Sequence, residues 1–169
     1  STVILALAIT LASYTLQSAE AKASDEGAIS TLILPIQFVS QLSEPAPTGW
    51  TDELTPTPYC VAAASVMAMS AFGVETWSLA ATFAVGQGGN VTLDPGIDPA
   101  GNSHLFRQFG GEGRIHSFWD RTTALNELVG RLNSGSPVIF YGQSGNHAMV
   151  AYGYEADWGG TVGRVRCRS

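Results

Sequence analysis

The sequence predicts an α+β domain in which helices come first and an antiparallel sheet comes last. Segments of helical composition or spacing fill the middle of the chain, between residues 59 and 132. After residue 135, apolar runs alternate with turns, at Ser136–Tyr141, His147–Tyr154 and Thr161–Cys167. The 169 residues suffice for one domain, and 45% hydrophobic against 13% charged residues is the composition of a chain that folds.

Net charge limits the kind of partner. The formal charge is −6, and the longest basic cluster is the short run Arg164–Arg168. A nucleic-acid-binding domain needs a basic face to displace counterions, so the sequence argues against nucleic acid as a partner.

The N-terminal segment resembles a secretory leader. Val3–Ala12 is apolar but shorter than the ~20 residues of a membrane-spanning helix. Ala21-Lys22-Ala23 has the small-x-small pattern of a cleavage site. We expect residues 1–23 to be a signal peptide that lacks its charged n-region, or else a short uncleaved anchor or a core helix. The protein would then be secreted or extracytoplasmic, with no stable membrane span in the mature form.

The domain itself is expected over residues 32–169, after a linker at 24–31. Leu32–Val39 is predicted as a short strand, at an edge or with a bulge because of Pro35. Glu44–Pro58 is rich in proline and threonine and reads as a loop. Tyr59–Phe72 is apolar on every face, which predicts a fully buried helix that Gly73 ends.

Further elements are expected between this helix and the sheet. Helical spacing or composition and glycine-rich breaks predict helices at Glu75–Val85, Pro99–Phe109 and Thr122–Leu132, with a short strand at Arg114–Phe118. The last predicted strand runs to the end of the given sequence, and together with the missing n-region this indicates a fragment at both ends.

Cys60 is the residue with the most distinctive chemical setting. A thiol is a nucleophile only as thiolate, and the first turn of a helix favours the anion through its N–H groups and dipole. A base is also required, and the chain has three histidines. His147 opens a predicted strand after the turn Gly142–Asn146, where it could face a helix packed on the sheet, whereas His104 and His116 lack that setting.

Three stretches in order resemble the papain-like cysteine peptidases, and within them the bacteriocin-processing, double-glycine-leader group. They are LPIQFVSQL (34–42), PYCVAAASVMAMSAFG (58–73) and LNSGSPVIFYGQSGNHAMVAYGYE (132–155). In the third, five residues separate His147 from Gly153-Tyr154. The resemblance covers residues 32–169 and implies a papain-like fold, with a helical part packed on a C-terminal antiparallel sheet.

The resemblance also implies roles for residues at the matching positions. Cys60 would be the nucleophile and His147 the general base. Gln41 would donate its amide N–H to the oxyanion, with Gln37 as the rival for that role. Trp50 and Asn146 are candidates to line the substrate groove, although Trp50 could equally cover a helix.

The residue that should orient His147 is missing from the pattern. In the resembled group it stands at the end of the next strand, where this sequence ends. Asp157 is a downstream carboxylate, but ten residues of extended strand would place it ~30 Å from His147. We therefore leave this position unassigned, beyond residue 169 or absent.

Blander interpretations stay open for the same residues. Cys60 could be a packed core thiol, or it could form a disulfide with Cys167 in an exported protein. The cysteine and the histidines have no metal-ligand spacing, and no metal or other cofactor is expected. Asn90, Asp94, Asp98 and Asn102 do not follow a calcium-loop pattern, which favours a solvated loop or a lid over the cleft.

These observations together predict an exported bacterial cysteine peptidase acting on peptides or proteins. Two alternatives remain. The same dyad could serve an amidase or acyl transferase on cell-wall peptides, or the domain could be a catalytically inactive papain-like module for surface binding.

Overall fold

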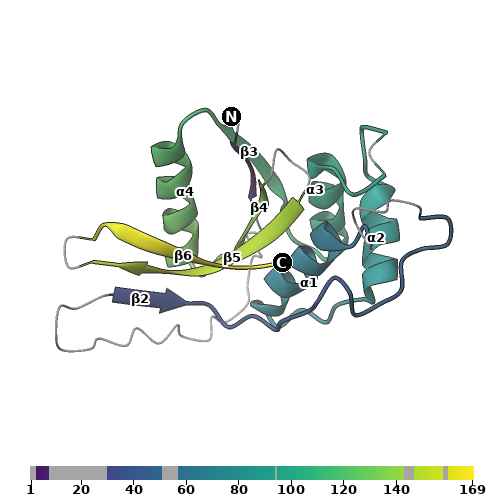
Figure 1. The fold of residues 1–169 in the computed structure, drawn as a ribbon, viewed down its shortest axis with the longest axis horizontal. Coiled ribbons are helices and arrows are strands. Elements are labelled where there is room, and N and C mark those ends of the chain that lie inside the picture. The colour runs from purple at the N-terminus through teal and green to yellow at the C-terminus, as the bar shows by residue number, and fades with distance from the viewer. Residues whose placement is uncertain (1–2, 8–29, 51–56, 94, 143–146, 158–159) are drawn as a thin grey trace.

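The computed structural model describes residues 3–7, 30–50, 57–93, 95–142, 147–157 and 160–169. Over these residues it confirms a mixed α+β fold with four helices and an antiparallel sheet (Figure 1). Two short strands precede the helices, so the predicted order of helices first and sheet last is too simple. The N-terminal strands join the same sheet as the C-terminal ones.

Strand β5 pairs with more strands than any other described strand of the sheet. It spans His147–Ala156 and pairs antiparallel with β4 (Val138–Gly142), β2 (Ser30–Ile33) and β6 (Val162–Arg168). The sheet order is β2-β5-β4-β1-β3, where β1 is Val3–Leu7 and β3 is Arg114–Phe118. Pairing with three strands holds β5 in place, and His147 is held with it as its first residue.

The two faces of β4 and β5 form two separate cores. Ile139, Tyr141, Ala148 and Val150 join the cluster of helices α1, α2 and α3, whereas Val138 and Ala151 join the cluster of α4. This alternation follows from the two-residue period of a strand. The sheet is therefore covered by α1 on one face and α4 on the other.

Four helices make up the helical part of the described chain. Their bounds are Cys60–Ser70 (α1), Leu79–Gln87 (α2), Pro99–Gln108 (α3) and Arg121–Asn133 (α4). Helix α1 is buried on every side, as predicted from its uniformly apolar sequence. Its alanines 62, 63, 64 and 68 are 0% exposed, and so is Ala148 on the facing strand. Small side chains thus bring α1 close to β5.

Two predicted elements are shorter than expected. The strand predicted at Leu32–Val39 is only Ser30–Ile33, and its pairing ends after Leu34 N–H donates to Tyr152 O (2.7 Å), because Pro35 has no N–H. The helix predicted from Glu75 starts at Leu79, because Ser78 caps it by accepting from Ala81 N–H (3.2 Å).

The predicted leader is described only in part. Val3–Leu7, in the apolar run assigned to a signal peptide, forms β1 and pairs with β3 and β4. Residues 8–23 lie outside the described residues, so the leader and the export that it implies stay predictions. Among the described residues, no helix is both long enough and apolar enough to cross a membrane.

Gly153 of the predicted Gly-Tyr pair gives a test of the sheet geometry. A Cβ at this position would collide with the backbone carbonyl of Leu32 on β2, whereas a Cβ at Gly163 on β6 meets nothing within 4 Å. We expect Gly153→Ala to lower the free energy of unfolding by about 2 kcal/mol, from overpacking against rigid backbone. Gly163→Ala should stay within about 0.5 kcal/mol of the parent protein. Urea denaturation of both variants measures the difference, and equal stabilities would contradict the β2–β5 packing.

Candidate functional site: Cys60, His147 and the Gln41 turn

Cys60 is the first residue of α1, as the sequence predicted, and it is half-buried. Its thiol lies at the helix N-terminus, where Tyr59 provides no side-chain cap and the described first turn carries no carboxylate. Both features leave the positive end of the helix dipole available to an anion. The position therefore favours a thiolate at Cys60.

Cys167 offers a contrast within the same chain. It is paired with Ala151 in the β5–β6 register and packs in the α4-side cluster, whereas Cys60 packs in the α1-side cluster. Both cysteines of the chain are described, and they are not joined, so the disulfide alternative is wrong for this structure. Burial raises the pKa of Cys167 to about 11, so this thiol stays protonated at neutral pH.

His147 is the first residue of β5 and is half-buried. Its successor Ala148 belongs to the same hydrophobic cluster that Cys60 packs against, so β5 and α1 share one core. Strand alternation sends Ala148 toward α1 and the His147 ring to the other side. The ring could therefore reach the Cys60 sulfur only by passing the end of β5.

No hydrogen bond joins the two side chains in this structure. Among the described residues, the His147 ring makes no side-chain hydrogen bond or ion pair. Catalytic hydrogen bonds are often long in the absence of substrate and tighten when substrate binds.

Gln41 lies on a turn that is tied to the segment just before Cys60. Thr57, three residues before the cysteine, donates its hydroxyl to the Gln41 carbonyl (2.9 Å). The Gln41 side-chain oxygen Oε1 is buried, and no donor is bonded to it among the described residues. Since a buried polar atom without a partner is costly, such an atom often marks a functional group.

Gln37, the rival oxyanion donor, lies at the other end of α1. Its backbone N–H donates to Ser70 Oγ (2.7 Å), at the last residue of the helix. The ten steps from Cys60 to Ser70 span ~15 Å at 1.5 Å per residue. Gln37 is therefore too far from Cys60 for that role, and only Gln41 remains of the two.

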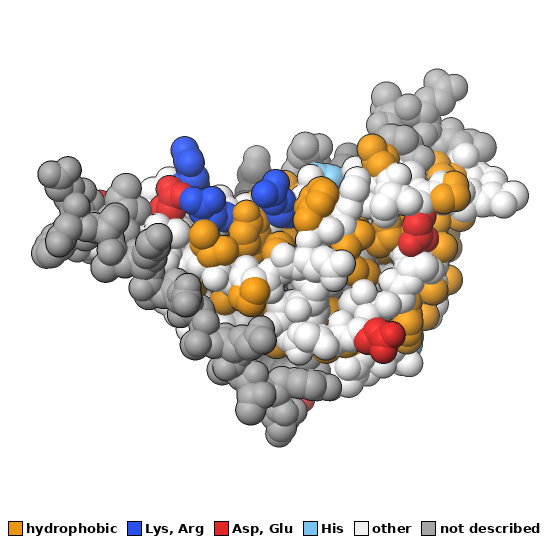
Figure 2. Space-filling model, turned by 90° about the horizontal axis from the view of Figure 1, so that it is seen from below, with side chains coloured by type: hydrophobic (Ala, Val, Ile, Leu, Met, Phe, Trp, Pro, Cys, Tyr) orange, Lys and Arg blue, Asp and Glu red, His pale blue; other side chains and the backbone are white. Residues whose placement is uncertain are grey.

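The segment that leads into the turn is held on the surface by an aromatic contact. Phe38 is 57% exposed, and the guanidinium of Arg168 lies 5.6 Å from the centre of its ring. Figure 2 shows this face from below, with hydrophobic side chains gathered beside Lys or Arg. Together with the Gln37–Ser70 bond, this contact fastens the segment to both β6 and α1.

Glu44 and Tyr59 hold the turn from the other side, and no sequence motif marks either residue. The Glu44 carboxylate accepts from Leu79 N–H (2.6 Å) and Ala80 N–H (2.9 Å), the first two residues of α2. Tyr59 donates its hydroxyl to the Pro45 carbonyl (3.1 Å). Burial and the nearby charge of Glu44 raise the pKa of the Tyr59 phenol, so it stays a donor.

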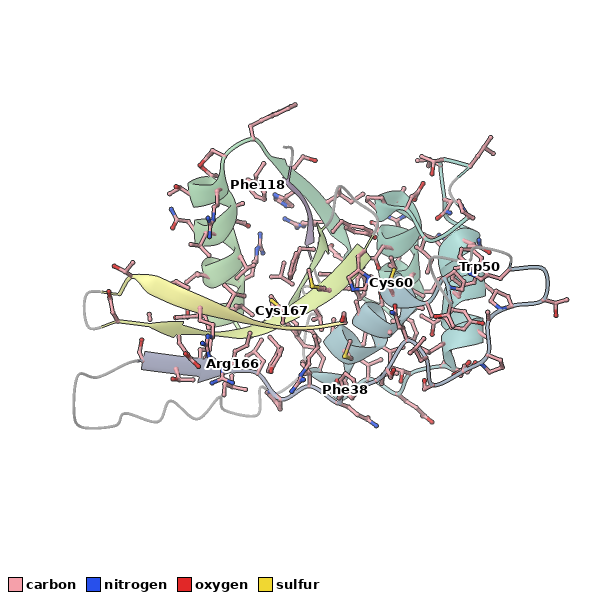
Figure 3. The ribbon with its side chains drawn as sticks, in the orientation of Figure 1. Phe38, Trp50, Cys60, Phe118, Arg166 and Cys167 are labelled. Atoms are coloured by element: carbon pink, nitrogen blue, oxygen red, sulfur yellow. The ribbon has the colours of Figure 1, made fainter. Side chains whose placement is uncertain are left out.

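The remaining candidates have mixed outcomes. Trp50 is half-buried, and in the view of Figure 3 it lies over the helices, beyond Cys60 from the sheet. Asn146 lies outside the described residues, so its assignment stays a prediction. Asp157 follows the last residue of β5, at the opposite end of the strand from His147, and it accepts from Thr161 N–H (2.8 Å).

Asp98 forms the centre of the loop that was predicted to be solvated or to act as a lid over the cleft. Its carboxylate caps α3 through Gly101 N–H (2.7 Å) and accepts from Val91 N–H (2.9 Å) and from Thr92 N–H and hydroxyl (3.0 Å each). Asp98 is 4% exposed, so this part of the loop is ordered around a buried carboxylate and is not simply solvated. Asn102 is also buried, and its Oδ1 accepts from Ser65 of α1 (2.9 Å). Asp94 lies outside the described residues.

Neither a metal site in the described segments nor a similar protein was found. Within the described part of the chain, no group of three His, Cys, Asp or Glu side chains is arranged to hold a metal ion. The chain matches no family model, and neither the curated proteins nor the solved structures gave a significant match.

The carboxylate of Asp98 should contribute stability that depends on pH. Burial opposes its ionisation, but the hydrogen bonds from Gly101, Val91 and Thr92 outweigh burial and lower its pKa. The stabilisation is therefore complete above the ordinary Asp pKa of about 3.9 and is lost as pH falls through the lower folded value. Asp98→Asn should cost about 2 kcal/mol at neutral pH, because the new amide faces N–H donors.

The cost of Asp98→Asn should shrink below about pH 4, when measured by urea denaturation across pH. Asp120, which caps α4 through Thr123 N–H (2.8 Å), gives the matched control. Its replacement by Asn retains the capping oxygen and should have little effect. A cost that is independent of pH for Asp98→Asn would contradict the role of its charge.

Proposed function

We propose that this protein is an exported cysteine peptidase of papain-like fold. Cys60 is the nucleophile, His147 is the general base, and the Gln41 amide donates to the oxyanion. The substrate is a peptide or protein segment. Export rests on the leader predicted at residues 1–23.

One observation carries the proposal: Cys60 begins α1, the turn of Gln41 is hydrogen-bonded to Thr57 just before that helix, and the strand that begins with His147 packs in the same core as α1. Acyl transfer by a thiol uses a nucleophile, a general base and an oxyanion donor, and these three side chains are of the types required.

The reaction then proceeds in two steps. The Cys60 thiolate bonds to the carbonyl carbon of the scissile peptide, and the carbonyl oxygen becomes an oxyanion held by the Gln41 amide and the Cys60 N–H. Collapse breaks the C–N bond, and the leaving amine takes the proton from the His147 imidazolium. Water, deprotonated by His147, attacks the thioester, releases the carboxylic acid and restores the thiol.

Selective alkylation tests the nucleophile. Near pH 6, where an ordinary thiol is almost fully protonated, we expect iodoacetamide to label one cysteine, because the helix N-terminus favours the Cys60 thiolate. Mass spectrometry should find the label on Cys60. Cys60→Ser should abolish labelling, whereas Cys167→Ser should leave its rate unchanged, since Cys167 stays protonated. Labelling no faster than that of an ordinary thiol would contradict the proposal.

Proteolysis of an unfolded protein tests the reaction. The protein should cleave denatured casein, and cleavage should disappear in Cys60→Ser and fall by at least about 10²-fold in His147→Ala. Both variants should keep the circular dichroism spectrum of the parent protein. A protein whose Cys60 is alkylated rapidly but which cleaves no casein would favour the amidase or acyl-transferase alternative. Slow alkylation together with no cleavage would favour an inactive binding module.

A further inference from the structure

Glu44 forms hydrogen bonds to a helix that is distant from it in the sequence. It is 35 residues from Leu79 in sequence, and its two carboxylate oxygens accept the first two N–H groups of α2. That helix already has its own cap, because Ser78 accepts from Ala81 N–H, and the first intrahelical bond runs from Thr82 N–H to Ser78 O (2.9 Å). Ser78 does not satisfy the N–H groups of Leu79 and Ala80, so Glu44 both caps α2 and ties the loop that carries Glu44 to that helix.

That loop carries Gln41, three residues before Glu44. Ser43 N–H donates to Ser40 O (3.0 Å), which closes the turn around Gln41. The Gln41 carbonyl is fixed by Thr57, and the Pro45 carbonyl by Tyr59. Glu44 is the one ionised group among these attachments, and hydrogen bonds to a carboxylate are about twice as strong as neutral ones.

We propose that Glu44 is a positioning residue that holds the Gln41 amide where the oxyanion forms. This inference rests on the proposed function. An oxyanion donor acts only if it is held in place before charge develops, since its worth lies in preorganisation. Loss of Glu44 should loosen the turn and weaken transition-state stabilisation, while the thiolate of Cys60 is left intact.

Two reactions of the same sulfur separate this role from a general loss of structure. Acylation of Cys60 by p-nitrophenyl acetate passes through an oxyanion, whereas alkylation by iodoacetamide displaces iodide and forms none. We expect Glu44→Gln to slow acylation about tenfold and Gln41→Ala to slow it about 10²-fold. Neither substitution should change the alkylation rate by more than about twofold, since alkylation does not use the oxyanion site.

Ser78→Ala is the matched control on the same helix end. It removes a cap of α2 without touching the Gln41 turn, so it should lower Tm by a few degrees and leave the acylation-to-alkylation ratio unchanged. The double variant Glu44→Gln/Gln41→Ala should acylate no more slowly than Gln41→Ala alone, because both changes act through one group.

The outcomes separate the two proposals. If Cys60 reacts with both reagents and Glu44→Gln leaves their ratio unchanged, Glu44 has no positioning role and the proposed function stands. Additive losses in the double variant, or an equal loss with Ser78→Ala, would also overturn the role of Glu44. If Cys60 of the parent protein is no more reactive than Cys167, the proposed function fails, and the inference fails with it.

Discussion

The close packing of α1 against β5 is the constraint on which the rest of the structure depends. A helix can approach a strand this closely only where both present small side chains, and here alanines do so on both sides. The alanines of α1 and Ala148 are completely buried in the shared core. Helix α1 and strand β5, which begin with Cys60 and His147, therefore share one core.

A second layer of attachments surrounds this edge. The chain between β2 and α1 has little regular structure, yet it is fastened at several points along its described length. Gln37 bonds to the end of α1, Phe38 contacts Arg168, Gln41 bonds to Thr57, and Glu44 bonds to the start of α2. Such bonds satisfy polar groups that a helix or strand would otherwise satisfy. They also convert a loop into a support for one amide side chain.

The sequence predicted the parts of the fold that follow from periodicity and composition. The uniformly apolar run after Tyr59 predicts α1, and the apolar runs between turns predict β4, β5 and β6 close to their observed bounds. Pro35 was interpreted only as a bulge or an edge, although its missing N–H ends β2 early. The start of α2 was misplaced because Ser78 was not recognised as its cap.

The candidate site divides in the same way. Cys60 and His147 could be proposed from sequence because each opens a regular element. Glu44 could not, because a carboxylate in a proline-rich loop is indistinguishable from a solvated one until its partners, 35 residues away, are known. The sequence favours Gln41 over Gln37 because Gln41 follows the strand and enters the loop. The structure adds that the two residues contact opposite ends of α1.

The ionisation of Cys60 shows whether this residue carries an activated thiolate. The ultraviolet absorbance of the thiolate, followed across pH in the Cys167→Ser variant, reports Cys60 alone, because the chain has only two cysteines. We expect a Cys60 pKa well below the ordinary value of about 8.5, and a rise in that pKa in His147→Ala. A pKa at or above the ordinary value, with no change in His147→Ala, would contradict this expectation.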